Sequence, residues 1–168
     1  MDTPRTAIFF AALAMGSLPA LAQSPPRTTA QSVGGHFASI NRRVLEIAKD
    51  FPDDKYDYRL KPEMRSFGAV IVHIASGNIY AAKAGRGENV NWDVLDPKDY
   101  KTKAAVVGLL EKSIADADAT LKNLPDDSFM RTAEPWLSVT EHSAEHYGLV
   151  VAYYRAKGLV PPESRPKK

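Results

Sequence analysis

The spacing of apolar residues is the feature that most restricts what this chain can fold into. In four segments, at about residues 28–50, 66–83, 99–123 and 135–157, apolar side chains recur at steps of three and four. Because an α-helix has about 3.6 residues per turn, this spacing places them on one face of each helix. No segment has the sustained alternation typical of a strand. The sequence therefore predicts an all-α protein, a four-helix bundle with long inter-helix connections.

Proline and glycine mark the ends of these segments. Pro52 follows the first segment, Gly85 the second, Pro125 the third and Gly158 the fourth. Proline cannot continue a helix, and glycine is common immediately after one. We expect a polar loop from Pro125 to Pro135. Since the connections are long, chain order alone does not fix which helices are neighbours.

The first 22 residues have the three parts of a secretory signal peptide. Arg5 gives a weak positive charge, an apolar run extends from Ala7 to Leu18, and small residues at Ala20 and Ala22 provide a cleavage site. An uncleaved membrane anchor is the alternative, but the run is shorter than the about 20 residues of a membrane span. We expect cleavage after Ala22 and no stable membrane anchor after processing.

The chain is thus divided into a signal peptide at 1–22, a linker at 23–29 and a helical bundle domain at 30–164. It contains no cysteine, which excludes disulfides, thiolate metal ligands and a cysteine nucleophile. An exported protein, periplasmic or secreted, fits these features. The net charge of +2 comes from scattered basic residues, so we expect no nucleic acid partner. Small bundles of this kind can form homodimers.

Two histidines in the last segment point to a metal. His142 and His146 are four residues apart, so in a helix they are neighbours with Cβ atoms about 5–6 Å apart. They share an apolar stripe with Val139, Val150 and Tyr153. Burying imidazoles is costly unless their nitrogens are bonded, and a divalent metal bonds them well. The alternative is a pair of hydrogen-bonded core histidines without a metal.

His73, in the second predicted helix, is the natural third ligand. Ala69, Ser76 and Gly77 are small one-turn neighbours that would leave room for an ion. Three histidines leave a coordination position open for water or substrate. Imidazole suits several metals, so we expect a divalent ion such as Zn, Ni or Fe without selecting one. The fourth histidine, His36, is interpreted as a boundary residue of the first helix.

Other polar residues near these histidines suggest roles in catalysis. Glu145 and Tyr147 follow in the same helix, and Tyr80 lies in the second helix; all three are catalytic candidates. The pattern from His142 through Glu145 to His146 also matches the H-x-x-E-H signature of some metallopeptidases. Those enzymes need a further acidic ligand well downstream, and the short chain after His146 offers no suitable one. A metallopeptidase is therefore a weak alternative.

Four short motifs together resemble the DinB-like family of helical-bundle proteins, over about residues 30–164. They are R-S-F-G from Arg65, V-H-I-A from Val72, H-x-x-E-H-Y-G from His142, and Y-R-x-K-G-L-V-P-P from Tyr154. The resemblance implies a crossed-over four-helix bundle that holds a divalent metal on three histidines. Those positions correspond here to His73, His142 and His146. Relatives in this superfamily include S-transferases that use bacillithiol or mycothiol, whose thiol the metal activates; these act in the cytoplasm.

Three hypotheses of function follow from these residues and from the resemblance. The first is a metal-dependent hydrolase or thiol-transferase that acts on an unknown small-molecule substrate, because a bound metal lowers the pKa of water to about 7. The second is a module that binds a metal or small ligand without chemistry. The third is a structural metal that joins the second helix to the fourth.

Overall fold

The computed structural model describes residues 27–166 and shows a bundle of four long helices. They are α1 (Thr29–Asp50), α2 (Phe67–Gly85), α3 (Lys103–Lys122) and α5 (Ala133–Ala156). A short helix, α4 (Asp126–Arg131), precedes α5, and the described residues contain no strand. The predicted all-α four-helix fold is confirmed. The predicted signal peptide and most of the linker lie outside the described residues.

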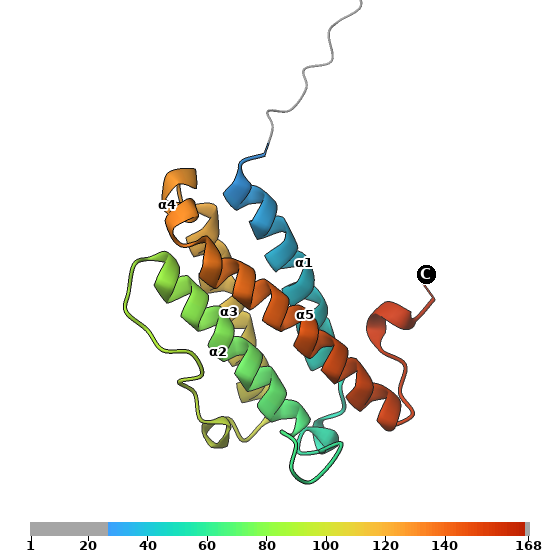
Figure 1. Ribbon diagram of the computed structural model, residues 1–168. Helices are drawn as coiled ribbons and strands as arrows, with labels where there is room; N and C mark the ends of the chain where they lie inside the picture. The colour runs from blue at the N-terminus through green and yellow to red at the C-terminus, as the bar shows by residue number, and fades with distance from the viewer. Residues whose placement is uncertain (1–26, 167–168) are drawn as a thin grey trace, which may run out of the picture.

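The connectivity is crossed, as the resemblance implied. Helix α2 packs against α3 and α5, and α1 packs against the same two helices. The consecutive helices α1 and α2 therefore lie diagonally across the bundle. Figure 1 shows that α2 and α3 run in one direction and α1 and α5 in the other. Since α2 and α3 are parallel, residues 86–102 must return along the length of the bundle to join them.

Side-chain caps begin three of the long helices. Thr28 forms a capping box with Gln31 at the start of α1, and Ser66 accepts a hydrogen bond from the backbone of Ala69 at the start of α2. Thr102 caps α3 in the same way. The cap at Thr102 explains why α3 starts later than the predicted position near residue 99. Residues 97–99 form a separate 3₁₀ turn.

The prediction of a polar loop from Pro125 to Pro135 is wrong for most of this segment. The structure places α4 within it, with Asp126 and Asp127 in the first turn, where acidic side chains interact favourably with the helix dipole. Phe129 of α4 is buried and anchors this helix to the core. Pro135 lies in the first turn of α5, where a helix tolerates proline.

The core is rich in aromatic side chains at one end of the bundle and contains a small group of buried polar side chains near its middle. The rings of Phe51 and Phe67 stack with centroids 3.9 Å apart. Asn78 of α2 donates to the side chains of Asn41 on α1, at 3.1 Å, and Ser113 on α3, at 3.4 Å. All three side chains are buried. Because buried polar groups need partners, these bonds favour one register between the diagonal helices.

Within residues 27–166, no helix combines the length and the apolar composition that crossing a membrane requires.

Gly85→Ala should destabilise the bundle. A Cβ atom at Gly85 would lie 2.7 Å from Cζ2 of Trp136, a fully buried side chain that cannot move freely. Overpacking of this kind costs about 1–3 kcal/mol in the free energy of unfolding, which urea denaturation measures. Gly108→Ala is the matched control. It lies in an open, exposed position of α3, where the change should stabilise by about 0.5–1 kcal/mol. Equal effects at both positions would contradict the packing argument.

Candidate metal centre

Three imidazoles converge between the adjacent helices α2 and α5. His73 comes from α2, and His142 and His146 come from successive turns of α5. One nitrogen of each ring lies within 4.8 Å of the other two, and the three ring centroids are 4.2–5.0 Å apart. All three residues are partly buried. The structure therefore brings together the three histidines that the spacing of the sequence predicted.

The spacing of the ring nitrogens suits a metal with a small adjustment. Nε2 of His73 and Nε2 of His142 are 2.9 Å apart, a hydrogen-bond distance. Two ligands of a tetrahedral zinc ion, each at about 2.0–2.1 Å from the metal, are separated by about 3.3 Å. Small rotations of the rings would open this gap. The donor set of three neutral imidazoles also fits a borderline-soft divalent ion.

Hydrogen bonds at the far nitrogens orient two of the rings. Nδ1 of His73 lies 2.9 Å from Oδ1 of Asp93, and Nδ1 of His146 lies 3.0 Å from the backbone oxygen of His142. Both partners are acceptors, so each Nδ1 carries the proton. Nε2 of His73 and Nε2 of His146 are then left with lone pairs. This is the tautomer that metal sites with a carboxylate–histidine pair use.

Asp93 was not predicted as a site residue, and it adopts an uncommon backbone conformation. It is in the left-handed region with φ of 60°, which is rare for residues other than glycine but less so for aspartate. It lies in the connection between α2 and α3. Such strain persists where other contacts stabilise it, and here the bond to His73 does so. The second oxygen of Asp93 lies 3.5 Å from Nη2 of Arg65.

Trp92 forms an aromatic wall of the site. Its ring packs edge-on against His142, with centroids 5.1 Å apart, and lies 4.7 Å from the ring of Tyr80. A Cβ atom at Gly77 would come within 2.9 Å of Trp92. From the sequence, the small Gly77 was expected to make room for an ion. The structure shows instead that the ring of Trp92 lies against it.

Burial keeps the histidines of α5 neutral. Burial, with smaller contributions from the neighbouring His146 and His73, lowers the pKa of His142 to about 4. Burial also lowers the pKa of His146. The hydrogen bond with His73 holds the pKa of Asp93 below its usual value. At neutral pH both imidazoles of α5 are therefore unprotonated, the form in which histidine binds a metal.

The other residues singled out from the sequence are not bonded to the three histidines. Glu145 is exposed on α5, and its charge slightly opposes the lowering of the pKa of His146. Tyr147 faces α1, where its ring lies 5.2 Å from the guanidinium of Arg43. His36 is exposed on α1, as its interpretation as a boundary residue requires. The structure does not bring Tyr147 or His36 to the three histidines.

Comparison with known proteins identifies the family. Residues 36–154, well over half of the chain, match the family model of the DinB superfamily. The chain therefore belongs to that superfamily. The matched region extends from α1 to α5 and includes all three clustered histidines. A search of curated proteins gives no match.

Acidification should destabilise the metal-free protein partly through His142. Its pKa is about 4 in the folded state and 6.5 in the unfolded state, so the unfolded chain binds more protons between these values. This contribution to stability is complete above pH 6.5 and decreases as the pH falls towards 4. We expect urea denaturation in the presence of a chelator to show a smaller loss over this range in His142→Gln than in the wild type. Identical pH profiles would contradict the argument.

Proposed function

We propose that this DinB superfamily protein binds one divalent metal ion on His73, His142 and His146 and acts as a metal-dependent hydrolase or thiol-transferase on a small molecule. The observation that supports this is the convergence of three imidazole nitrogens from two helices within 4.8 Å. Zn, Ni and Fe all suit such a ligand set. At a three-ligand site the metal would supply an open position and lower the pKa of a bound water to about 7.

The surrounding residues of the chain prepare this site. The carboxylate of Asp93 accepts the Nδ1 proton of His73, and the carbonyl oxygen of His142 accepts that of His146. Trp92 shields one side of His142. The side chain of His73 remains 12% exposed, so the cluster is not sealed from solvent. Glu145, exposed one residue before His146, is the candidate to accept a proton from a reacting group. We propose no catalytic role for Tyr147 at this face.

A non-catalytic metal module is the second candidate. Among the described residues, Asp93 is the one carboxylate bonded to the histidine cluster, and it already contacts both His73 and Arg65. Glu145, the one candidate base, is exposed and, among residues 27–166, makes no hydrogen bond to the cluster. The site therefore also suits ligand binding without chemistry, or a metal that joins α2 to α5. Retention of an exchangeable water on the bound metal separates a ligand-binding or catalytic site from a purely structural one.

We further propose that the protein is exported to the periplasm or secreted, because of the signal-like residues 1–22.

His146→Ala should abolish metal binding, because it removes one of three ligands. After loading with Zn, Ni or Fe and removal of excess metal, elemental analysis should find one ion per wild-type chain and almost none per variant. His36→Ala removes an exposed histidine away from the cluster and is the matched control, which should keep one ion. A variant that retains its full metal content would refute the ligand set. Turnover that persists in chelated protein would refute the enzyme hypothesis and leave the binding module.

Asp93→Asn should weaken the metal site without removing a ligand. The amide keeps the shape of the side chain but loses the charge that holds the Nδ1 proton of His73. Loss of such a partner typically reduces metal affinity by about 10–100-fold, which competition with a chromophoric chelator measures. Asp127→Asn on α4, whose side chain is 77% exposed, is the control and should leave the affinity unchanged. Equal affinities for the two variants would show that Asp93 does not support the metal.

A further inference from the structure

Arg65 lies beside the histidine cluster, connected to it through one carboxylate. It immediately precedes Ser66, the residue that caps α2. Its Nη2 is 3.5 Å from Oδ2 of Asp93, while Oδ1 of the same carboxylate is 2.9 Å from Nδ1 of His73. A single side chain of the α2–α3 connection thus contacts both the guanidinium and a member of the cluster.

The guanidinium of Arg65 has unused hydrogen-bonding capacity. A charge-assisted N–H···O bond is usually about 2.7–2.9 Å long, so the contact with Asp93 is loose. Among residues 27–166 this guanidinium makes no hydrogen bond, and its side chain is 51% exposed. Arg86, by contrast, donates to Glu88, Asp116 and Thr120. Arginine carries five N–H donors, and among the described residues none of those on Arg65 is engaged in a hydrogen bond.

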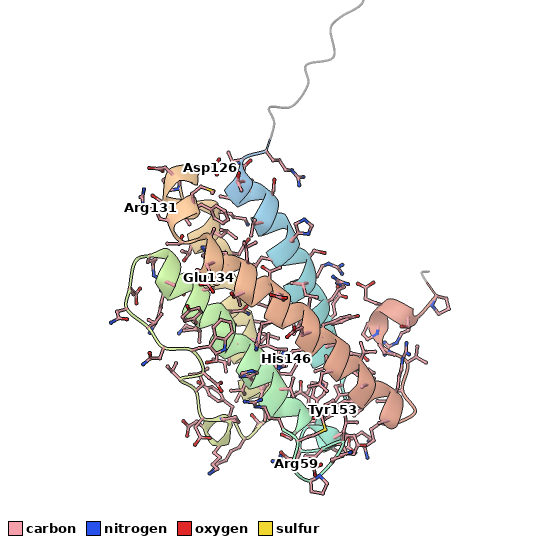
Figure 2. All side chains as sticks on the ribbon, in the orientation of Figure 1. Arg59, Asp126, Arg131, Glu134, His146 and Tyr153 are labelled. Carbon is pink, nitrogen blue, oxygen red and sulfur yellow. The ribbon has the colours of Figure 1, made fainter. Side chains whose placement is uncertain are left out.

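The backbone at Arg65 is held by the same two helices that carry the histidines. Its carbonyl oxygen accepts a hydrogen bond from the hydroxyl of Tyr153, a buried residue of α5. Figure 2 shows Tyr153 further along α5 from His146, toward the end of the bundle where α2 begins. The backbone of Arg65 is therefore fixed, and its half-exposed guanidinium forms one loose ion pair, with Asp93.

The positive charge of Arg65 lies on the same side of the bundle as the cluster. Its guanidinium contacts one oxygen of Asp93, and the other oxygen of that carboxylate is bonded to His73. A bound divalent ion would add a second positive centre next to this one.

We propose that Arg65 recognises a second anionic group of the ligand, so that the site selects small molecules with two oxyanion groups, such as dicarboxylates. One oxyanion would bind at the open side of the three histidines, and the other would pair with the free N–H groups of the guanidinium. The planar fork of arginine matches carboxylate geometry. Asp93 keeps its hydrogen bond to His73 when this ligand binds. This assignment rests on the proposed metal centre and names the substrate class for it.

Cobalt-loaded protein and two matched acids test the proposal. Succinate and butyrate have carbon chains of equal length and differ in the second carboxylate. The visible spectrum of Co(II) reports replacement of its bound water by either anion. We expect the wild type to bind succinate at least about tenfold more tightly than butyrate, the effect of one added charged hydrogen-bonding group.

Arg65→Gln should remove this preference by lowering the affinity for succinate to about that for butyrate. Arg131→Gln makes the same change in charge at a site 69% exposed on α4, at the opposite end of the bundle in Figure 2, and should keep the preference. A visible spectrum of the unliganded Co(II) variant equal to that of the wild type shows that the variant still folds and holds its metal. Persistence of the succinate preference in Arg65→Gln would overturn the assignment of Arg65. Failure of the wild type to bind cobalt on the histidines would instead refute the metal centre.

Discussion

The contact between α2 and α5 is the interaction on which the candidate site depends. These helices are not consecutive in the chain, because α3 and α4 lie between them in sequence, but they contribute to the same core. Only their packing places His73 of one beside His142 and His146 of the other. The pair is supported from outside by the Trp92 ring against His142 and by the Asn78 bonds to the remaining two long helices. Since packed interiors resist small displacements, the rings meet in a pre-arranged geometry before any ion binds.

Much of this arrangement could be predicted from the sequence, because helical periodicity is a local property. The four long helices and the inward position of His142 and His146 follow from apolar spacing alone. His73 required the additional inference that the second and fourth helices are neighbours. The family match and the clustered nitrogens agree with that inference. Helix α4 was missed because its single buried residue, Phe129, leaves too short a pattern to recognise.

The supporting residues could not be predicted, for a different physical reason. Asp93 and Trp92 lie in a connection whose path depends on a positive φ and on long-range contacts with α2 and α5. Neither leaves a periodic signal. Arg65 stands in a motif that resembles the family, yet its placement beside Asp93 becomes visible only when residues 86–102 return along the bundle. In a site of this kind the ligands follow from helical register, and their partners follow from the loop.

The parallel arrangement of α2 and α3 has a consequence for how such a protein can diverge. Because the connection from α2 to α3 must run along the bundle, it passes the histidine cluster and places Trp92 against His142. Gly87 and Glu88 bond the carbonyl oxygens at the end of α2, but residues 89–95 form no helix and cap none of the long helices. Replacements within 89–95 can therefore reshape this side of the histidine cluster and leave the four helices intact. The residues of this connection that line the histidine cluster and the residues that hold the four helices together therefore lie largely in separate stretches of the chain.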